Sequence, residues 1–138
     1  MKYVLDASVA AKWFLPEADS RLALALRDDY QQQVHELIAP DVFPLEIAHA
    51  LIRAERKGVV SHPDAVIKLV DVFTLSPILH PHLPLLPRAL EIASSFRLAV
   101  SDCLYVALAE REKCQLVTAD ERMTKALTGF PVVLFSAV

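Results

Sequence analysis

Short, continuously apolar segments that alternate with helical patterns are the feature of this sequence that most restricts its fold. Continuous apolar runs are typical of strands with both faces buried, as in a parallel sheet, whereas half-exposed antiparallel strands alternate apolar and polar residues. We expect such strands at residues 3–5, 37–39, 116–117 and 132–135, with a weaker candidate at 78–79.

The segments between these strands carry apolar residues at helical spacing. They predict helices at residues 9–15, 19–33, 44–57, 62–74, 87–96, 102–113 and 121–128. Ser8 is the expected N-cap of the first helix, and Gly58 and Gly129 are expected to end two others. Strands that alternate with helices predict an α/β fold, here a three-layer α/β/α sandwich around a parallel sheet of four to five strands.

Length and composition restrict the class of protein further. The chain has 138 residues, which suits one domain over residues 1–138, because domains commonly span about 100–150 residues. Only two glycines are present, which excludes the glycine-rich loops that bind dinucleotides or nucleotide phosphates. Acids outnumber bases 17 to 14, which argues weakly against a protein that coats nucleic acid through bulk positive charge.

The cysteines and the apolar runs indicate the compartment. Cys103 and Cys114 are too few for a thiolate zinc site or a disulfide framework, so we expect two thiols in a reducing cytosol. No apolar run approaches the roughly 18 residues that a membrane span requires. Asp6 interrupts the N-terminal apolar segment before a signal peptide is complete. We therefore expect a cytoplasmic protein without a membrane segment.

Four of the acids stand in unusual places. Asp6 directly follows the first expected strand, and Asp120 follows the strand at residues 116–117. Ligands of open α/β sheets bind beyond the carboxyl ends of the strands, so these two acids share one crevice if their strands are neighbours. Asp102 opens a strongly apolar helical segment, and Glu46 is a single charge inside a largely apolar one.

Each acid also has an ordinary structural interpretation. Asp102 and Asp120 suit the start of a helix, as caps or as charges near the helix dipole. Thr118 and Glu121 match a capping box, which would place Asp120 inside the first turn of its helix. Glu46 could pair with a basic residue on the same helix or face water. Asp6 is the hardest to explain, because a carboxylate that ends a buried strand is costly unless it is satisfied.

Taken together, the four acids favour a metal site. Carboxylates that converge on one crevice repel each other, and some of them would have to stay protonated at neutral pH. A divalent cation removes this conflict, and hard oxygen ligands suit Mg²⁺ or Mn²⁺. Such a cation activates water and neutralises charge on a phosphoryl group.

Three segments carry a resemblance to a known family. The segments LDAS at residues 5–8, SDCLYVALA at 101–109 and LVTAD at 116–120 resemble those of PIN-domain ribonucleases, and in particular VapC-type toxins of toxin–antitoxin pairs. The resemblance covers essentially the whole chain. It implies an α/β/α sandwich with a parallel sheet of order 3-2-1-4-5, whose switch point lies between the first and fourth strands.

The resemblance also implies roles for single residues. Asp6 and Asp102 correspond to direct metal ligands, Glu46 to the family's helix acid, which holds a water or a second metal, and Asp120 to its fourth acid. Ser8 and Thr118 occupy the family's hydroxyl positions, where they would orient waters or carboxylates. Two residues depart from the family pattern, since His49 replaces a frequent amide and Cys103 replaces a small alanine.

The implied activity is that of a metal-dependent endoribonuclease. It would hydrolyse phosphodiester bonds of single-stranded RNA with Mg²⁺, or Mn²⁺, as its cofactor. The implied partners are the RNA substrate, a cognate antitoxin protein and a second copy of the chain in a homodimer. A second hypothesis is a catalytically silent PIN-like module that binds RNA or protein. A phosphoacceptor that uses Asp6 lacks the D-x-D partner, because Ser8 stands at that position.

Two surfaces have more than one interpretation. Arg53, Arg56 and Lys57, together with Lys12, either contact RNA phosphates near the metal or form a solvated helix end. The apolar segment at residues 22–26 and the apolar residues near the start of the following helix (Val42, Phe43 and Leu45) either pack in the core or form the antitoxin groove and the dimer face that the family implies.

Overall fold

The computed structural model describes residues 1–15 and 20–138. A parallel sheet of five strands forms its centre, with the strand order β3-β2-β1-β4-β5. The strands are β1 (Lys2–Leu5), β2 (Glu36–Pro40), β3 (Ile78–His80), β4 (Gln115–Thr118) and β5 (Val132–Leu134). The register pairs Leu5 with Val117, so β1 and β4 end side by side. This order and this parallel pairing confirm the expected α/β fold.

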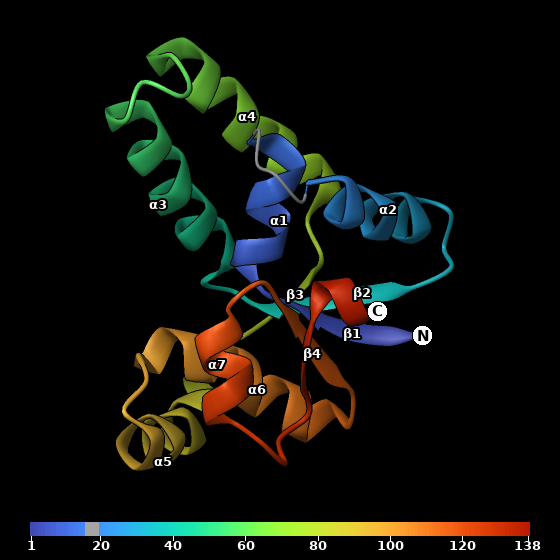
Figure 1. Ribbon diagram of the computed structural model, residues 1–138, viewed down its shortest axis with the longest axis vertical. Helices are drawn as coiled ribbons and strands as arrows, with labels where there is room; N and C mark the ends of the chain where they lie inside the picture. Colours follow the sequence, from blue (N-terminus) through green and yellow to red (C-terminus); the bar gives the residue numbers. More distant parts are fainter. Residues whose placement is uncertain (16–19) are drawn as a thin grey trace.

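Helices cover both faces of the sheet. Figure 1 shows α1 to α4 on one side of the strands and α5 to α7 on the other. The helices are α1 (Ala7–Phe14), α2 (Ser20–Gln31), α3 (Phe43–Arg56), α4 (His62–Leu75), α5 (Leu86–Phe96), α6 (Val100–Glu112) and α7 (Glu121–Ala126), with short 3₁₀ turns at Leu83–Leu85 and Phe135–Ala137. The pair α3 and α4 extends away from the sheet (Figure 1).

The core lies around the two central strands and α6. Val4 and Leu5 of β1 and Leu116 and Val117 of β4 are fully buried, as continuous apolar runs predict for strands covered on both faces. Helix α6 is buried without interruption from residue 103 to residue 109, because it packs on α5 and on the sheet. The carboxyl ends of β1 and β4 therefore emerge side by side from a buried apolar core.

The structure contradicts the expected N-cap at Ser8 and the capping-box interpretation of Thr118. Helix α1 begins at Ala7, directly after Asp6, so Ser8 lies inside the first turn and does not cap it. Thr118 is the last residue of β4 rather than the N-cap of the next helix, and Asp120 holds the capping position of α7. In both cases the hydroxyl donates to the buried Asp6 carboxylate in a charge-assisted hydrogen bond. Its oxygen accepts from a backbone N–H group in the segment after β4 rather than from the first turn of the helix that it was expected to cap.

Other boundaries agree with the sequence to within a few residues. Gly58 adopts a φ of 77° just after α3, and this left-handed conformation explains the glycine at the end of that helix. The helix expected from residue 19 is described from Ser20 onwards, and residue 19 lies outside the described residues. Helix α6 begins two residues before Asp102, which places this acid in the first turn.

No single helix in the described ranges is long and apolar enough to cross a membrane, whereas Leu83–Phe96 and Val100–Glu112, bent by 117°, reach that length and composition as a pair.

Candidate active site

Asp6 is the buried acid at the centre of the candidate site. Its side chain is 6% exposed, and its backbone N–H donates to the carbonyl of Val117 at 3.0 Å, which continues the pairing of β1 with β4. Asp6 Oδ2 accepts hydrogen bonds from Ser8 Oγ at 2.7 Å and from Thr118 Oγ1 at 2.6 Å. Burial raises the pKa of Asp6, and these two hydrogen bonds oppose that rise.

The two hydroxyl groups also connect Asp6 to the segment that follows β4. Ser8 Oγ accepts a hydrogen bond from the backbone N–H of Ala119 at 3.1 Å, and Thr118 Oγ1 accepts one from the backbone N–H of Asp120 at 3.1 Å. Each hydroxyl therefore donates to the same carboxylate oxygen and accepts from the backbone. The result is a network that fixes Asp6 against the end of the neighbouring strand.

Asp120 has a structural task and also faces the cavity. Its Oδ1 accepts hydrogen bonds from the backbone N–H groups of Arg122 at 2.9 Å and Met123 at 3.2 Å, so it caps α7. Its negative charge raises the pKa of Asp6 and Asp102. The helix-start interpretation of Asp120 is thus correct and does not exclude a role in the site.

Glu46 and Asp102 reach the same place from two helices on opposite faces of the sheet. Glu46 lies in the first turn of α3, and Asp102 lies in the first turn of α6. Burial, followed by the charges of Asp6, Glu46 and Asp120, raises the pKa of Asp102 to about 6. Burial is also the main reason why the pKa of Glu46 is raised, and Asp6 adds to the rise.

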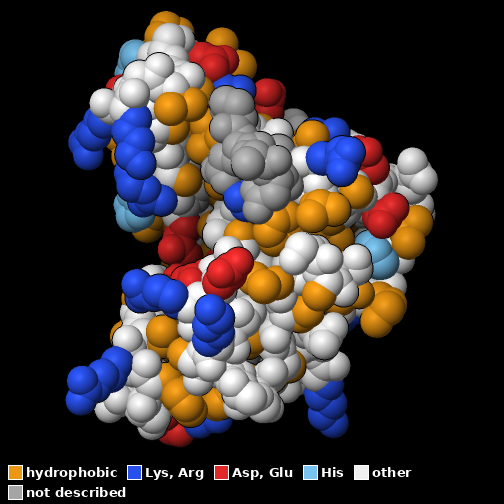
Figure 2. Space-filling view, in the orientation of Figure 1, with side chains coloured by type: hydrophobic (Ala, Val, Ile, Leu, Met, Phe, Trp, Pro, Cys, Tyr) orange, Lys and Arg blue, Asp and Glu red, His pale blue; other side chains and the backbone are white. Residues whose placement is uncertain are grey.

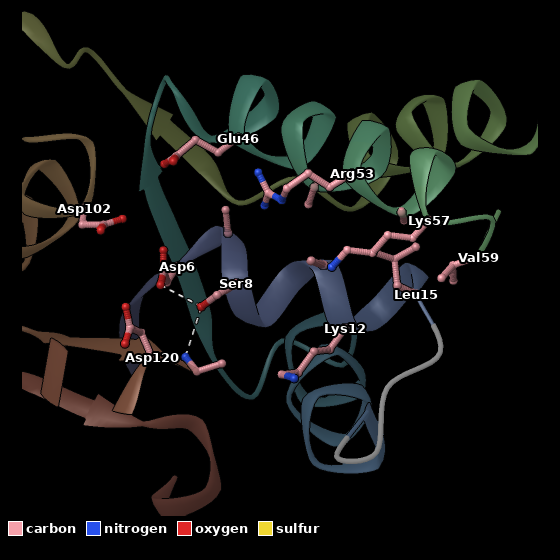
Figure 3. Close-up of a pocket in the computed structure, with 15 residues that line it drawn as sticks. Asp6, Ser8, Lys12, Leu15, Glu46, Arg53, Lys57, Val59, Asp102 and Asp120 are labelled. Atoms are coloured by element: carbon pink, nitrogen blue, oxygen red, sulfur yellow. Dashed lines mark hydrogen bonds between the residues drawn. The ribbon is translucent and has the colours of Figure 1, made fainter. Parts of the chain in front are cut away.

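All four carboxylates line one cavity of about 460 Å³. In Figure 3 their carboxyl groups converge at one end of it, with Asp6 and Asp120 on one side and Glu46 and Asp102 facing them. Figure 2 shows acidic side chains at the bottom of a hollow, with lysine and arginine side chains at its borders. The lining residues are Asp6, Ala7, Ser8, Ala11, Lys12, Leu15, Glu46, Ala50, Arg53, Ala54, Lys57, Val59, Asp102, Ala119 and Asp120.

The donor set fits a hydrated divalent cation. Within residues 1–15 and 20–138, no three potential ligands lie close enough together to enclose an ion. Mg²⁺ does not need such a cage, because it usually takes one or two carboxylates and keeps several waters. Glu46 Oε1 is shielded from solvent and has no hydrogen-bond partner among the described residues. An unpaired buried oxygen among repelling carboxylates is a setting that a cation stabilises.

The far end of the cavity is basic. Arg53 of α3, Lys57 directly after α3 and Lys12 of α1 line it (Figure 3). The positive charge of Arg53 lowers the pKa of Glu46, which places the guanidinium near the acids. Arg56 is exposed and does not line the cavity, although the sequence grouped it with Arg53 and Lys57. His49 is likewise exposed and outside the lining.

Tyr105 is a residue near the site that the sequence did not reveal. It is 0% exposed, and its hydroxyl lies beside the Glu46 carboxylate. Helix α6 is apolar on every side, so one more aromatic residue in the segment 103–109 looked like an ordinary core residue. Only its spacing of three residues from Asp102, which places both on one face of a helix, could have indicated it.

A five-stranded parallel sheet with carboxylates at the ends of β1 and β4 defines an α/β domain with an acidic crevice at the topological switch point. The sequence matches the PIN domain over residues 3–127, and the chain belongs to this family. PIN-domain ribonucleases depend in general on divalent metal ions.

Two relatives are similar over most of their length. Ribonuclease VapC3 of Pyrobaculum aerophilum is 30% identical over 127 residues, which are 91% of this chain and 94% of that protein. Ribonuclease VapC12 of Mycobacterium tuberculosis is 32% identical over 124 residues, which are 89% of this chain and 90% of that protein. The resemblance to VapC-type PIN domains is therefore confirmed.

Solved structures share the fold. The crystal structure of PAE2754 from Pyrobaculum aerophilum superimposes with a TM-score of 0.69 at 23% identity, covering 96% of this chain and 92% of that one. A toxin–antitoxin complex from Klebsiella pneumoniae contains a chain that superimposes with a TM-score of 0.61 at 14% identity, covering 96% of this chain and 97% of that one. These likenesses confirm the three-layer architecture.

Proposed function

We propose that this chain is a single PIN-like domain that acts as a metal-dependent endoribonuclease on single-stranded RNA, as the toxin of a type II toxin–antitoxin pair. The observation that carries this proposal is the cavity in which Asp6, Glu46, Asp102 and Asp120 converge. Membership in the PIN domain family and two relatives that are ribonucleases support the same activity.

The carboxylates supply the chemistry of such a site. A bound Mg²⁺ or Mn²⁺ would neutralise charge on the scissile phosphate and make water a better nucleophile at neutral pH. We assign Asp6 and Asp102 as its direct ligands. Burial makes the charged form of both carboxylates unfavourable, and a bound cation would offset that free-energy cost. Glu46 and Asp120 border the same space and would orient the attacking water and the cation's hydration shell.

Ser8 and Thr118 hold Asp6 in place. Both hydroxyls donate to Asp6 Oδ2, so Oδ1 remains available to a ligand. Hydrogen bonds that orient a ligating carboxylate commonly change metal affinity or activity by about 10–100-fold. We therefore propose that these two residues act on the cofactor through Asp6.

The basic end of the cavity supports a nucleic acid as the substrate. Four carboxylates alone would repel a polyphosphate, whereas Arg53 and Lys57 provide positive charge in the same cavity. Along α3, Arg53 lies seven residues and Lys57 eleven residues after Glu46, and about 1.5 Å of rise per residue places them roughly 10 and 16 Å further along the helix axis. A single RNA strand that enters between α1 and α3 would meet these cations before it reaches the acids.

The partners and the compartment complete the proposal. Apolar side chains are exposed on α4, and they include Val66, Ile67, Val70 and Phe73. Exposed apolar patches of this kind are typical of protein interaction surfaces. We propose that they serve a cognate antitoxin and a homodimer in the cytoplasm. The apolar residues at 22–26 and at the start of α3 have mixed positions. Ala23, Leu26 and Phe43 are core residues, whereas Leu22 and Leu45 are exposed.

Cleavage of unstructured RNA tests the proposed function directly. We expect the purified chain to cut a single-stranded RNA oligonucleotide with Mg²⁺ or Mn²⁺ and to stop when EDTA is added. Mn²⁺ should also raise the melting temperature of the protein, because a ligand that binds only the folded state stabilises it. A chain that neither cuts RNA nor responds to either cation would instead be the catalytically silent binding module.

Replacement of Arg53 by Ala is expected to weaken RNA binding, because Arg53 lines the cavity. The dependence of log Kd on log salt should become shallower by about 0.7, the value for one lost phosphate contact on a single strand. Fluorescence anisotropy with Ca²⁺ in place of Mg²⁺ measures both quantities. Arg56→Ala on the same helix is the matched control, since Arg56 is exposed outside the cavity. Equal effects of the two variants would contradict the assigned RNA path.

A further inference from the structure

Tyr105 is a fully buried polar side chain that the proposed reaction does not use. It lies in α6, three residues after Asp102, and it is 0% exposed. It does not line the cavity, so an RNA strand bound there would not touch it. Buried tyrosines usually find a hydrogen-bond partner for the hydroxyl.

The hydroxyl of Tyr105 lies beside Glu46. Because Tyr105 is fully buried and outside the cavity lining, it approaches the carboxylate from the interior of the protein. Its interaction with Glu46 lowers the pKa of that carboxyl group, against the larger effect of burial. Burial and the surrounding carboxylates raise the pKa of Tyr105, so the phenol keeps its proton and can act as a donor. However, neither Tyr105 Oη nor Glu46 Oε1 completes a well-aligned hydrogen bond within the described residues, and both atoms are shielded from solvent.

An unpartnered buried donor beside an unpartnered buried acceptor needs an explanation. Phenylalanine would fill the same space without an unsatisfied hydroxyl, so packing alone does not account for tyrosine. A carboxylate near a metal is commonly oriented by a hydrogen bond from behind. A donor on the interior side of Glu46 is placed to hold one carboxylate oxygen and leave the other for the cavity.

We propose that Tyr105 is a positioning residue for Glu46, whose hydroxyl donates to Glu46 Oε1 when a divalent cation enters the cavity and so directs Glu46 Oε2 toward that cation. The inference rests on the proposed function, because it requires a cation among the four carboxylates. It assigns no contact between Tyr105 and the RNA. The bond connects α6 to α3, so it also links the two helices that carry Asp102 and Glu46.

Tyr105→Phe removes only the hydroxyl and is the first test. We expect the melting temperature of the cation-free protein to stay the same or rise, because a buried unsatisfied group is lost. The Mn²⁺ concentration at half-maximal thermal stabilisation should rise about 10-fold. The kcat for an RNA oligonucleotide should fall by a similar factor with an unchanged KM. Tyr3→Phe is the matched control, since Tyr3 is also buried but donates to Met1 Sδ at the opposite end of the sheet.

Glu46→Gln identifies the partner. If the Tyr105 hydroxyl acts through the Glu46 carboxylate, Tyr105→Phe should cause no further change in the Mn²⁺ midpoint when Glu46 is already Gln. An unchanged midpoint in Tyr105→Phe alone, or an undiminished effect in the double variant, would overturn the inference. A wild-type chain that ignores Mn²⁺ altogether would instead refute the proposed metal dependence, so the two failures are distinguishable.

A measurement on the unmodified chain keeps the inference testable if Tyr105→Phe does not fold. The chain has three tyrosines, and selective ¹³C labelling at the ζ carbon should give three signals that Tyr3→Phe and Tyr30→Phe assign by elimination. Tyr30 donates to the carbonyl of Ser76 at 3.0 Å, away from the cavity. Mg²⁺ should shift the Tyr105 signal and leave the other two unchanged. A Tyr105 signal that does not respond to saturating Mg²⁺ would also overturn the inference.

Discussion

Asp6→Asn is expected to abolish cation-dependent RNA cleavage and, at the same time, to stabilise the cation-free protein. The activity should fall by 100-fold or more, because loss even of a residue that only orients a metal ligand costs about 10–100-fold. The stability should rise because the substitution removes a charge from a buried position, where burial is the main cause of the raised pKa.

The hydrogen bonds around Asp6 explain why the fold should survive this change. Both hydroxyl donors, Ser8 Oγ and Thr118 Oγ1, meet one carboxylate oxygen, Oδ2. The carbonyl oxygen of an asparagine has two lone pairs and can accept both hydrogen bonds. The amide nitrogen then takes the place of Oδ1, where it cannot serve as a ligand of a cation. The variant is therefore isosteric and keeps an acceptor for both hydroxyls, yet it lacks the ligand oxygen that we propose for Asp6.

Three measurements check this prediction. Cleavage of a single-stranded RNA oligonucleotide gives the activity, and thermal unfolding with and without Mn²⁺ gives the stability and the response to the cation. Asp71→Asn is the control for removal of one negative charge, because Asp71 is exposed on α4 outside the cavity. A variant that retains cleavage, or that is less stable than the wild-type chain without cation, would contradict the role assigned to Asp6.

The arrangement of the strands and the meeting of the acids could be predicted because they follow from chain-wide patterns. Continuous apolar runs indicate parallel strands, and parallel strands end at the same edge of the sheet. Asp6 directly follows β1 and Asp120 lies just beyond β4. Because these two strands are neighbours, their positions in the sequence were enough to predict that the two acids lie close together. The order of the strands came from the resemblance to PIN domains rather than from the apolar pattern.

The side-chain hydrogen bonds of the site could not be predicted, because their partners are distant in the sequence and a local pattern does not show them. Ser8 and Thr118 both match helix-capping patterns, but their hydroxyls donate to the buried carboxylate of Asp6. Their oxygens accept from backbone N–H groups in the segment after β4, and no local sequence pattern shows that this segment lies beside Asp6. Tyr105 was hidden for a different reason. It lies on a helix that is buried on all sides, so helical periodicity could not show which of its faces approaches Glu46.

Helical spacing alone did not predict which basic side chains line the cavity. Arg53, Arg56 and Lys57 are close in sequence, but only Arg53 and Lys57 line the cavity. Residues three and four positions apart are both neighbours on a helix surface, so spacing from Arg53 did not separate Arg56 from Lys57. The roles of these cations and of the four acids remain predictions, and the substitutions described above test them separately.

The stability of the cation-free protein is expected to increase as the pH falls from 7.5 toward 5. The pKa of Asp102 is about 6 in the folded chain, compared with an ordinary value of 3.8. Between these two values the folded state binds more protons than the unfolded state, so unfolding becomes more difficult as the pH decreases. Burial also raises the pKa of Asp6 and Glu46, which adds to the effect in the same direction.

A divalent cation should reverse this dependence, because it competes with protons for the same carboxylates. At pH 7.5 saturating Mg²⁺ should raise the melting temperature, and at pH 5 the gain should almost disappear, together with cleavage of RNA. Asp102 is partly exposed, so solvent screens its charge. For the cation-free protein we therefore expect the melting temperature to rise by only roughly 2–5 °C between pH 7.5 and pH 5. Asp102→Asn should flatten the pH dependence of the cation-free protein, whereas Asp71→Asn should leave it unchanged. A wild-type chain whose cation-free stability falls between pH 7.5 and 5 would contradict the raised pKa values of these carboxylates, because protonation would then not stabilise the folded state.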